Sequence, residues 1–460
     1  MSKKLRLLIA PIAIGVMTLV SCGGKSNGGN NNGGDNKQTS EVTEAKGGTV
    51  VKLGENEAQT NRLLSAFSGA ATNATASVQD KGLTAKAYAN FKKASAKLEN
   101  LAFFSANIAE VGFDISDLSL SVGASAKGQE GAAELKYDGK VRAFATVQTP
   151  KQVAQEEATR EPDAPIAIAQ PEMEEKKADL TVNGGFNAKA YVKNDNLYVD
   201  LSDRSLLAFA ASNYASVKNA AEAVGAEIDF QTMFGDNPTE ALTNYWETFK
   251  LDKFYLPLAF VFGNNDEPQY RVATRGVEDG QEVHEEYEPD VNDIVWFAED
   301  YVDFHLYEDN SAALNVKFAL ENVYDVMLKV MIRTDAATLA DAKTAYAALT
   351  DEAKAQAKES FKSLIDLSAV EKASVNAYVA IDKDARLTKA ELGVDAKGAY
   401  TVGEAEENKP ACVFSFEVNG KVGAELKYDT VEYTVPEDLS AFVDGQSILA
   451  MLSGGENEPK

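Results

Sequence analysis

The run DLSLSVGASAKGQEGAAELKYDGKVRAFATVQ, residues 117–148, decides the fold. Apolar side chains recur at every second position, and most of the positions between them are polar. This alternation is typical of antiparallel strands that bury one face and leave the other in water. Polar turns divide the run, so it predicts a β-meander. The apolar positions are Leu118, Leu120, Val122, Ala124, Ala126, Ala133, Leu135, Tyr137, Val141, Ala143, Ala145 and Val147.

Period-two alternation also predicts strands further along the chain. They are expected at residues 180–192, 197–201, 302–306, 314–320, 326–330, 375–381, 392–396, 412–418 and 422–428. On one of them, Cys412 falls on the apolar face, which favours a buried core thiol over a nucleophile.

Helices are expected where apolar residues recur at three- and four-residue spacing. Within residues 83–104 the stripe consists of Ala87, Phe91, Ala94, Leu98 and Leu101. The expected helices cover residues 56–70, 83–104, 206–224, 237–249, 339–349, 351–367 and 439–452. Strands and helices together predict an α+β fold, in which one or more curved antiparallel sheets pack against helices.

Composition excludes several functions. The 460 residues include 45 Lys or Arg and 71 Asp or Glu, a net charge of −26. Such a chain cannot hold nucleic acid by neutralising phosphates, and anionic membrane surfaces repel it. It has two Cys and two His, which leaves little material for a zinc site or a histidine base.

The first 22 residues predict an export signal. Three cations, Lys3, Lys4 and Arg6, precede an apolar run over residues 7–20. As a helix this run would span about 21 Å, less than the roughly 30 Å of a bilayer core. It ends in Leu-Val-Ser-Cys22, which resembles the lipobox of bacterial lipoproteins. The resemblance implies cleavage before Cys22, acylation of that residue and anchoring on the extracytoplasmic face of a bacterial membrane. The alternative is a secretory signal with an incidental Cys.

We divide the chain accordingly. Residues 1–21 are the signal peptide, and residues 22–47, rich in Gly and Asn, are the acylated Cys and a flexible tether. Residues 48–225 form an N-terminal α+β half with a Pro- and Glu-rich disordered insertion at 149–178. Residues 226–460 form a C-terminal α+β half with a helical pair at 335–370.

Part of one strand recurs later in the chain. The segment GAAELKYD, residues 131–138, is echoed by VGAELKYD, residues 422–429. The echo indicates either a duplicated helix-plus-meander unit or chance similarity between amphipathic strands.

Few residues suggest chemistry. His284 and His305 lack further zinc ligands nearby and are expected at the surface. Residues 278–309 hold 13 Asp or Glu and no Lys or Arg, which indicates a solvated acidic surface or, alternatively, a Ca²⁺ site. The segment 382–391 resembles a calcium loop but lacks its central Gly, and the flanking strands favour a hairpin turn. We expect no cofactor, no metal and no catalytic residue.

The segment YVKNDNLYVDLS, residues 191–202, together with the lipobox, the tether and the meander, resembles the LolA-like family of lipoprotein carriers. The resemblance implies a half-open sheet that binds acyl chains or other apolar ligands against helices. Small side chains at Ala124, Ala126, Ala188 and Ala190 would either make room for a ligand or let helices pack closely.

We therefore expect a non-enzymatic, membrane-anchored binding lipoprotein that carries a hydrophobic ligand at residues still to be determined. The alternative is a surface structural or interaction lipoprotein with a filled core, which binds a protein or glycan partner. An enzyme comes third, and two buried carboxylates with perturbed pKa values at a cleft would support it.

Overall fold

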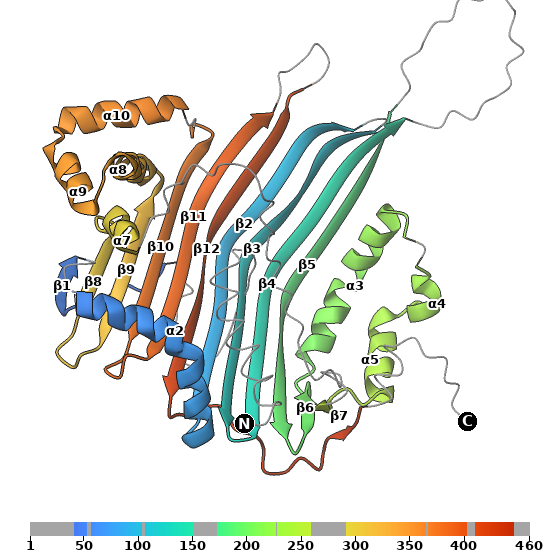
Figure 1. The fold of residues 1–460 in the computed structure, drawn as a ribbon. Helices are drawn as coiled ribbons and strands as arrows, with labels where there is room; N and C mark the ends of the chain where they lie inside the picture. Colours follow the sequence, from blue (N-terminus) through green and yellow to red (C-terminus); the bar gives the residue numbers. More distant parts are fainter. Residues whose placement is uncertain are drawn as a thin grey trace, which may run out of the picture.

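The computed structural model describes residues 41–52, 57–103, 106–150, 173–226, 228–258, 291–364, 367–402 and 410–445. Its strands form one mostly antiparallel 13-stranded sheet that is curled but not closed (Figure 1). Helices pack on this sheet, which confirms the predicted α+β fold class. The strand order is β1-β8-β9-β10-β11-β12-β2-β3-β4-β5-β6-β7-β13.

The elements have these bounds. The strands are β1 (Thr49–Lys52), β2 (Leu83–Phe103), β3 (Ala106–Lys127), β4 (Glu130–Pro150), β5 (Met173–Lys193), β6 (Asn196–Asp200), β7 (Lys253–Pro257), β8 (Val302–Leu306), β9 (Ala312–Ala319), β10 (Val370–Ile381), β11 (Leu387–Val402), β12 (Cys412–Tyr428) and β13 (Val443–Asp444). The helices are α2 (Glu57–Asp80), α3 (Ser205–Ala223), α4 (Phe230–Phe234), α5 (Pro238–Thr248), α7 (Val291–Ala298), α8 (Val323–Asp335), α9 (Leu339–Ala348) and α10 (Asp351–Leu364), with a 3₁₀ turn at Leu320–Asn322.

The expected helix over residues 83–104 is wrong, because this segment is strand β2. Its pairing with β3 skips one position at Lys92 and another at Asn100. After each skipped position, the side chains that point to the apolar side shift by one position along the strand. Apolar residues of this strand therefore recur at spacings of three and four residues. The positions that share the apolar face are Ala87, Phe91, Ala94, Leu98 and Leu101.

Two further expectations are corrected. Residues 326–330 belong to helix α8 and not to a strand. Tyr324 and Leu328, four residues apart, are the apolar side chains that this helix buries. Near the C-terminus, residues 439–445 contain strand β13 and no helix, and the remainder of the helix expected at 439–452 lies outside the described residues.

Other predicted helices are confirmed. Asn237 caps α5 by accepting a hydrogen bond from the Glu240 amide, and Pro238 occupies the first helical position. Thr350 accepts from the Ala353 amide at the start of α10. Gly225 follows α3 with a φ of +73°, the left-handed conformation that glycine adopts most readily.

Three of the proposed domain boundaries can be compared with the elements of the structure. Residues 41–47, placed in the tether, lie against the sheet. Residues 149–150 and 173–178, placed in the insertion, continue β4 and β5, and residues 151–172 lie outside the described part. Strand β12 pairs with β2, so the sheet joins strands of both proposed halves.

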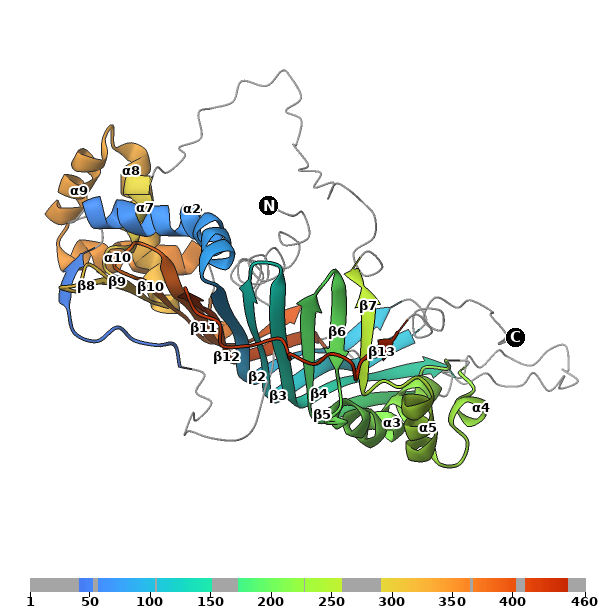
Figure 2. The ribbon, with the colours of Figure 1, turned by 90° about the horizontal axis from the view of Figure 1, so that it is seen from below.

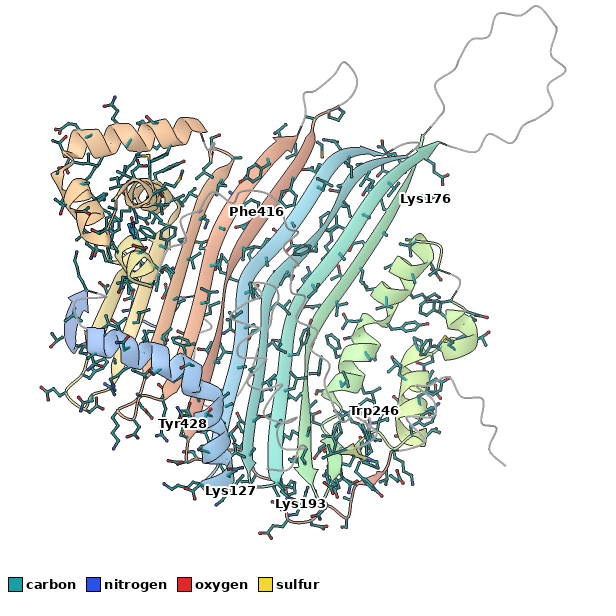
Figure 3. All side chains as sticks on the ribbon, in the orientation of Figure 1. Lys127, Lys176, Lys193, Trp246, Phe416 and Tyr428 are labelled. Atoms are coloured by element: carbon teal, nitrogen blue, oxygen red, sulfur yellow. The ribbon has the colours of Figure 1, made fainter. Side chains whose placement is uncertain are left out.

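Helix α2 covers the apolar face of the sheet at two places. Ala74 and Val78 of α2 pack against Ala126 and Tyr428 at the lower end of the sheet (Figures 1 and 3). Towards the β1 edge, Leu63 and Ala66 of α2 pack on strands β8, β9 and β10. Beyond β5, a separate cluster joins α3, α5, β6 and β7 around Trp246 (Figure 3).

Helix α3 also protects the edge of β5. Strand β6 pairs only with residues 189–193 of β5, so the rest of that strand needs other partners. Three side chains of α3 supply acceptors to its amides: Ser205 to Asn187, Asn213 to Asn183 and Ser216 to Thr181. Asn213, which is buried, also donates to the Asn183 carbonyl.

Two extended segments cross the polar face. The N-terminal strap, residues 41–48, runs over β12, β11 and β9 to β8. The C-terminal strap, residues 429–442, follows β12 and crosses to β13 along one end of the central strands (Figure 2). Amides of Glu432 and Tyr433 in the C-terminal strap donate to Ser125 on β3.

Within the described ranges, every helix is too short or too polar to cross a lipid bilayer.

Candidate functional site: an apolar sheet surface and a buried carboxylate

The middle of the apolar face carries two adjacent rows of side chains. In one row, Tyr400 of β11 pairs with Phe414 of β12, and the row continues through Leu98 and Val111. In the next row, Phe416 precedes Ala96 and Phe113. We call these side chains the central apolar surface. Its members are Tyr400, Phe414, Phe416, Leu98, Val111, Ala96 and Phe113.

The aromatic rings of this surface are stacked. The Phe416 ring lies 6.1 Å from that of Phe414 and 6.3 Å from that of Tyr400, with interplanar angles of 26° and 15°. Opposite Phe416 stands Gly398, where a Cβ would come within 2.8 Å of the Phe416 ring. Glycine therefore lets the ring lie over the neighbouring strand.

This surface is open to solvent. Phe414 is 38% exposed and Tyr400 is 37% exposed, whereas Leu118, lower on the same face, is 1% exposed. Figure 3 shows Phe416 on the upper half of the sheet, above α2 and Tyr428 and away from Trp246. Large apolar side chains that stay exposed side by side make this surface a candidate binding site.

The four alanines, for which ligand room and close helix packing were both open, are packed at two positions. Ala126 contacts Ala74 and Val78 of α2, and Ala188 packs against the cluster around Trp246. Ala124 is buried, and Ala190 is half-buried beside Val199. Close helix packing is thus the outcome at Ala126 and Ala188.

The polar face holds a buried carboxylate, Glu391 of β11. Its side chain is 1% exposed and accepts hydrogen bonds from the Thr43 amide at 2.6 Å and from the Tyr88 hydroxyl. Lys421 approaches it at 3.3 Å and Lys389 at 3.6 Å. Glu391 therefore fastens the N-terminal strap to the sheet.

The charge state of this cluster is fixed by its contacts. Burial alone would raise the pKa of Glu391, but the hydrogen bonds from Thr43 and Tyr88 and the charge of Lys421 lower it to about 2. Burial and the bond to Glu391 raise the pKa of Tyr88 above its ordinary value. At neutral pH the cluster is an ionised carboxylate beside a neutral phenol, an arrangement suited to holding a segment.

Three pockets lie away from the central apolar surface. One of about 550 Å³ lies between α8, α10 and the start of β10, where Lys362, Lys372 and Asp395 line it. Another, of about 440 Å³, lies beside the N-terminal strap, and one of about 210 Å³ lies beside the C-terminal strap.

In the described part of the acidic segment 278–309, two carboxylates form ion pairs with basic side chains. Asp293, 1% exposed, pairs with Arg333 at 2.6 Å, and Asp300 pairs with Lys329 at 2.7 Å. In the described parts of the chain no group of three potential ligands is placed to hold a metal. Residues 278–290 lie outside those parts.

The remaining candidate residues have these positions. Cys22 and His284 lie outside the described residues. Cys412 is half-buried at the start of β12. His305, expected at the surface, is buried on the polar side of β8, where its Nδ1 lies 2.9 Å from the Gly47 carbonyl of the N-terminal strap. The loop after β10 is the predicted hairpin turn, in which Asp382 accepts from the Asp384 and Arg386 amides.

The sequence did not single out the central apolar surface or the Glu391 cluster. For the central apolar surface, the sequence did contain an indication, because Phe414 and Phe416 alternate with polar residues on β12. Comparisons with protein-family models, curated proteins and solved structures found no match to this chain.

Proposed function

We propose that this chain is a lipid-anchored lipoprotein on the extracytoplasmic side of a bacterial membrane, and that it binds a hydrophobic ligand without transforming it. The anchor is the acylated Cys22, and the ligand lies on the central apolar surface. The observation that carries the proposal is the stacked group of Tyr400, Phe414 and Phe416 on the apolar face of the sheet, in which Tyr400 and Phe414 are exposed and Phe416 is half-buried.

The area of this group sets the strength of binding. A Phe side chain offers roughly 200 Å², so the exposed 38% of Phe414 amounts to about 75 Å². At about 25 cal/mol per Å², covering it contributes about 2 kcal/mol, or about 25-fold in affinity. Several such side chains together would hold a single acyl chain, whose methylenes contribute about 0.8 kcal/mol each.

The ligand is tested with the chain from residue 23 onward, purified without detergent. Native mass spectrometry should show a co-purifying lipid, and a fluorescent fatty acid should bind with an affinity that Phe414→Glu weakens at least 25-fold. Phe67→Glu, at a 45% exposed position of α2, is the matched control and should bind normally. Absence of lipid together with equal affinities of both variants would refute a ligand at this surface.

The anchor is tested separately in cells. The full chain should incorporate labelled palmitate and sediment with membranes, whereas Cys22→Ser should do neither. If Cys22→Ser still sediments with the envelope, the location fails even where the ligand experiment succeeds.

A further inference from the structure

Helices α3, α4 and α5 form an arm beside the sheet, which we call the helical arm, residues 205–248 (Figures 1 and 3). One side of α3 is bound to the edge of β5 through Asn213 and its neighbours. Phe209 of α3 packs on Tyr137 and Phe186 of the sheet, with ring centroids 5.4 and 5.3 Å apart. The arm is therefore held firmly on its sheet side.

The outer part of the arm exposes large apolar side chains. Tyr214 of α3 contacts Phe230 and Phe234 of α4, and the Tyr245 ring contacts Phe234. Around this aromatic centre the exposed fractions range from 43% to 70%. The exposed residues are Val217, Val224, Ile228, Met233 and Tyr245.

These five side chains belong to one neighbourhood. Val217 lies on α3 and Val224 is the residue that caps its C-terminus, and both follow Tyr214 at helical spacing on one side. Ile228 lies two residues before α4, and the Tyr245 hydroxyl donates to the Met233 carbonyl at 3.4 Å. An apolar neighbourhood of this kind on a rigid arm is typical of a protein interaction surface.

The acidic side chains around this patch indicate which kind of partner would bind there. Residues 205–248 contain six Asp or Glu and one Lys. Asp229, Asp236 and Glu240 are exposed and bond only to uncharged groups of the described chain, namely Thr232, Gln231 and Asn237. The negative charge of the arm repels an anionic membrane and a second copy of the same arm. The same negative charge attracts a cationic segment.

We propose that the outer face of the helical arm binds another protein through a segment that is both apolar and cationic. The apolar side chains of that segment cover Ile228, Met233 and Tyr245, and its Lys or Arg side chains meet Asp229, Asp236 and Glu240. This docking site is separate from the central apolar surface, so it does not depend on the proposed hydrophobic ligand.

The probe is a labelled helical peptide with one Leu face and one Lys face. Two companion peptides replace Lys by Glu or Leu by Ser. The full-length protein is measured without lipid, and fluorescence anisotropy gives the affinity. We expect the Leu/Lys peptide to bind, its affinity to fall with salt, and both companions to bind at least tenfold more weakly.

Variants locate the binding. Ile228→Ser with Met233→Ser should weaken the Leu/Lys peptide about tenfold, and Asp236→Asn with Glu240→Gln should weaken it and flatten its salt dependence. Phe67→Ser, an exposed apolar position outside the arm, is the control. Equal binding of the Leu/Lys and Leu/Glu peptides, or arm variants that behave like the control, would overturn the proposal. Circular dichroism verifies that each variant keeps its fold.

Discussion

Replacing Glu391 by Gln should loosen the N-terminal strap from the sheet. The variant keeps the size of the side chain but removes the charge that Thr43, Tyr88 and Lys421 stabilise. The pKa of Glu391 is lowered from an ordinary 4.5 to about 2. At about 1.4 kcal/mol per pKa unit, the ionised carboxylate contributes about 3 kcal/mol to the free energy of unfolding at pH 7.

The pH dependence follows from the direction of that shift. A lowered pKa in the folded state means that the contribution is complete well above pH 4.5 and is lost as the pH falls towards 2. The difference in unfolding free energy between wild type and Glu391→Gln should therefore fall from about 3 kcal/mol at pH 7 to about 1.4 kcal/mol at pH 3.

Urea unfolding at both pH values measures this difference, and hydrogen exchange of residues 41–48 reports on the strap. Glu371→Gln is the control, because Glu371 forms an exposed ion pair with Lys397 and should contribute less than about 1 kcal/mol. The reasoning fails if the wild-type-to-variant difference is the same at pH 7 and pH 3, or if exchange in the strap does not change.

Two further substitutions probe other parts of the fold. Asn213→Ala leaves the backbone N–H and C=O of Asn183 without their partner. The free energy of unfolding should fall by about 1–3 kcal/mol, and the Asn183 amide should exchange faster. Unchanged exchange would contradict the edge-protecting role of α3. Lys329→Met removes the buried ammonium that binds Asp300 at 2.7 Å. Burial raises the pKa of Asp300, but the charge and hydrogen bond of Lys329 outweigh burial and keep this pKa below its ordinary value. NMR titration of the variant should therefore show a higher Asp300 pKa than in the wild type. An equal pKa in both proteins would contradict the ion pair.

Much of the sheet could be predicted because its strands alternate cleanly. The prediction failed where alternation was disturbed or misleading. In β2, skipped pairings at Lys92 and Asn100 turned a period of two into apparent helical spacing. In α8, apolar residues surround much of the helix, and Val326, Leu328 and Val330 alone imitate a strand. Local patterns cannot reveal a skipped pairing, since it depends on the partner strand.

The candidate site was less accessible to prediction, because both of its parts depend on which strands become neighbours. Tyr400 and Phe414 meet only because β11 pairs with β12 in one particular register. Glu391 meets Thr43 across 348 residues of chain. The lipobox at Cys22 is local and needs no such information, and acylation there stays a prediction.

The neighbouring position of β2 and β12 has a consequence for how the molecule is made. Leu83 pairs with Tyr428, so the centre of the sheet is incomplete until almost the whole polypeptide has been delivered. Contacts between such distant segments form slowly. If the polypeptide is threaded across a membrane, as proposed here, the pairing of β2 with β12 on the far side can be completed only after β12 has also passed through.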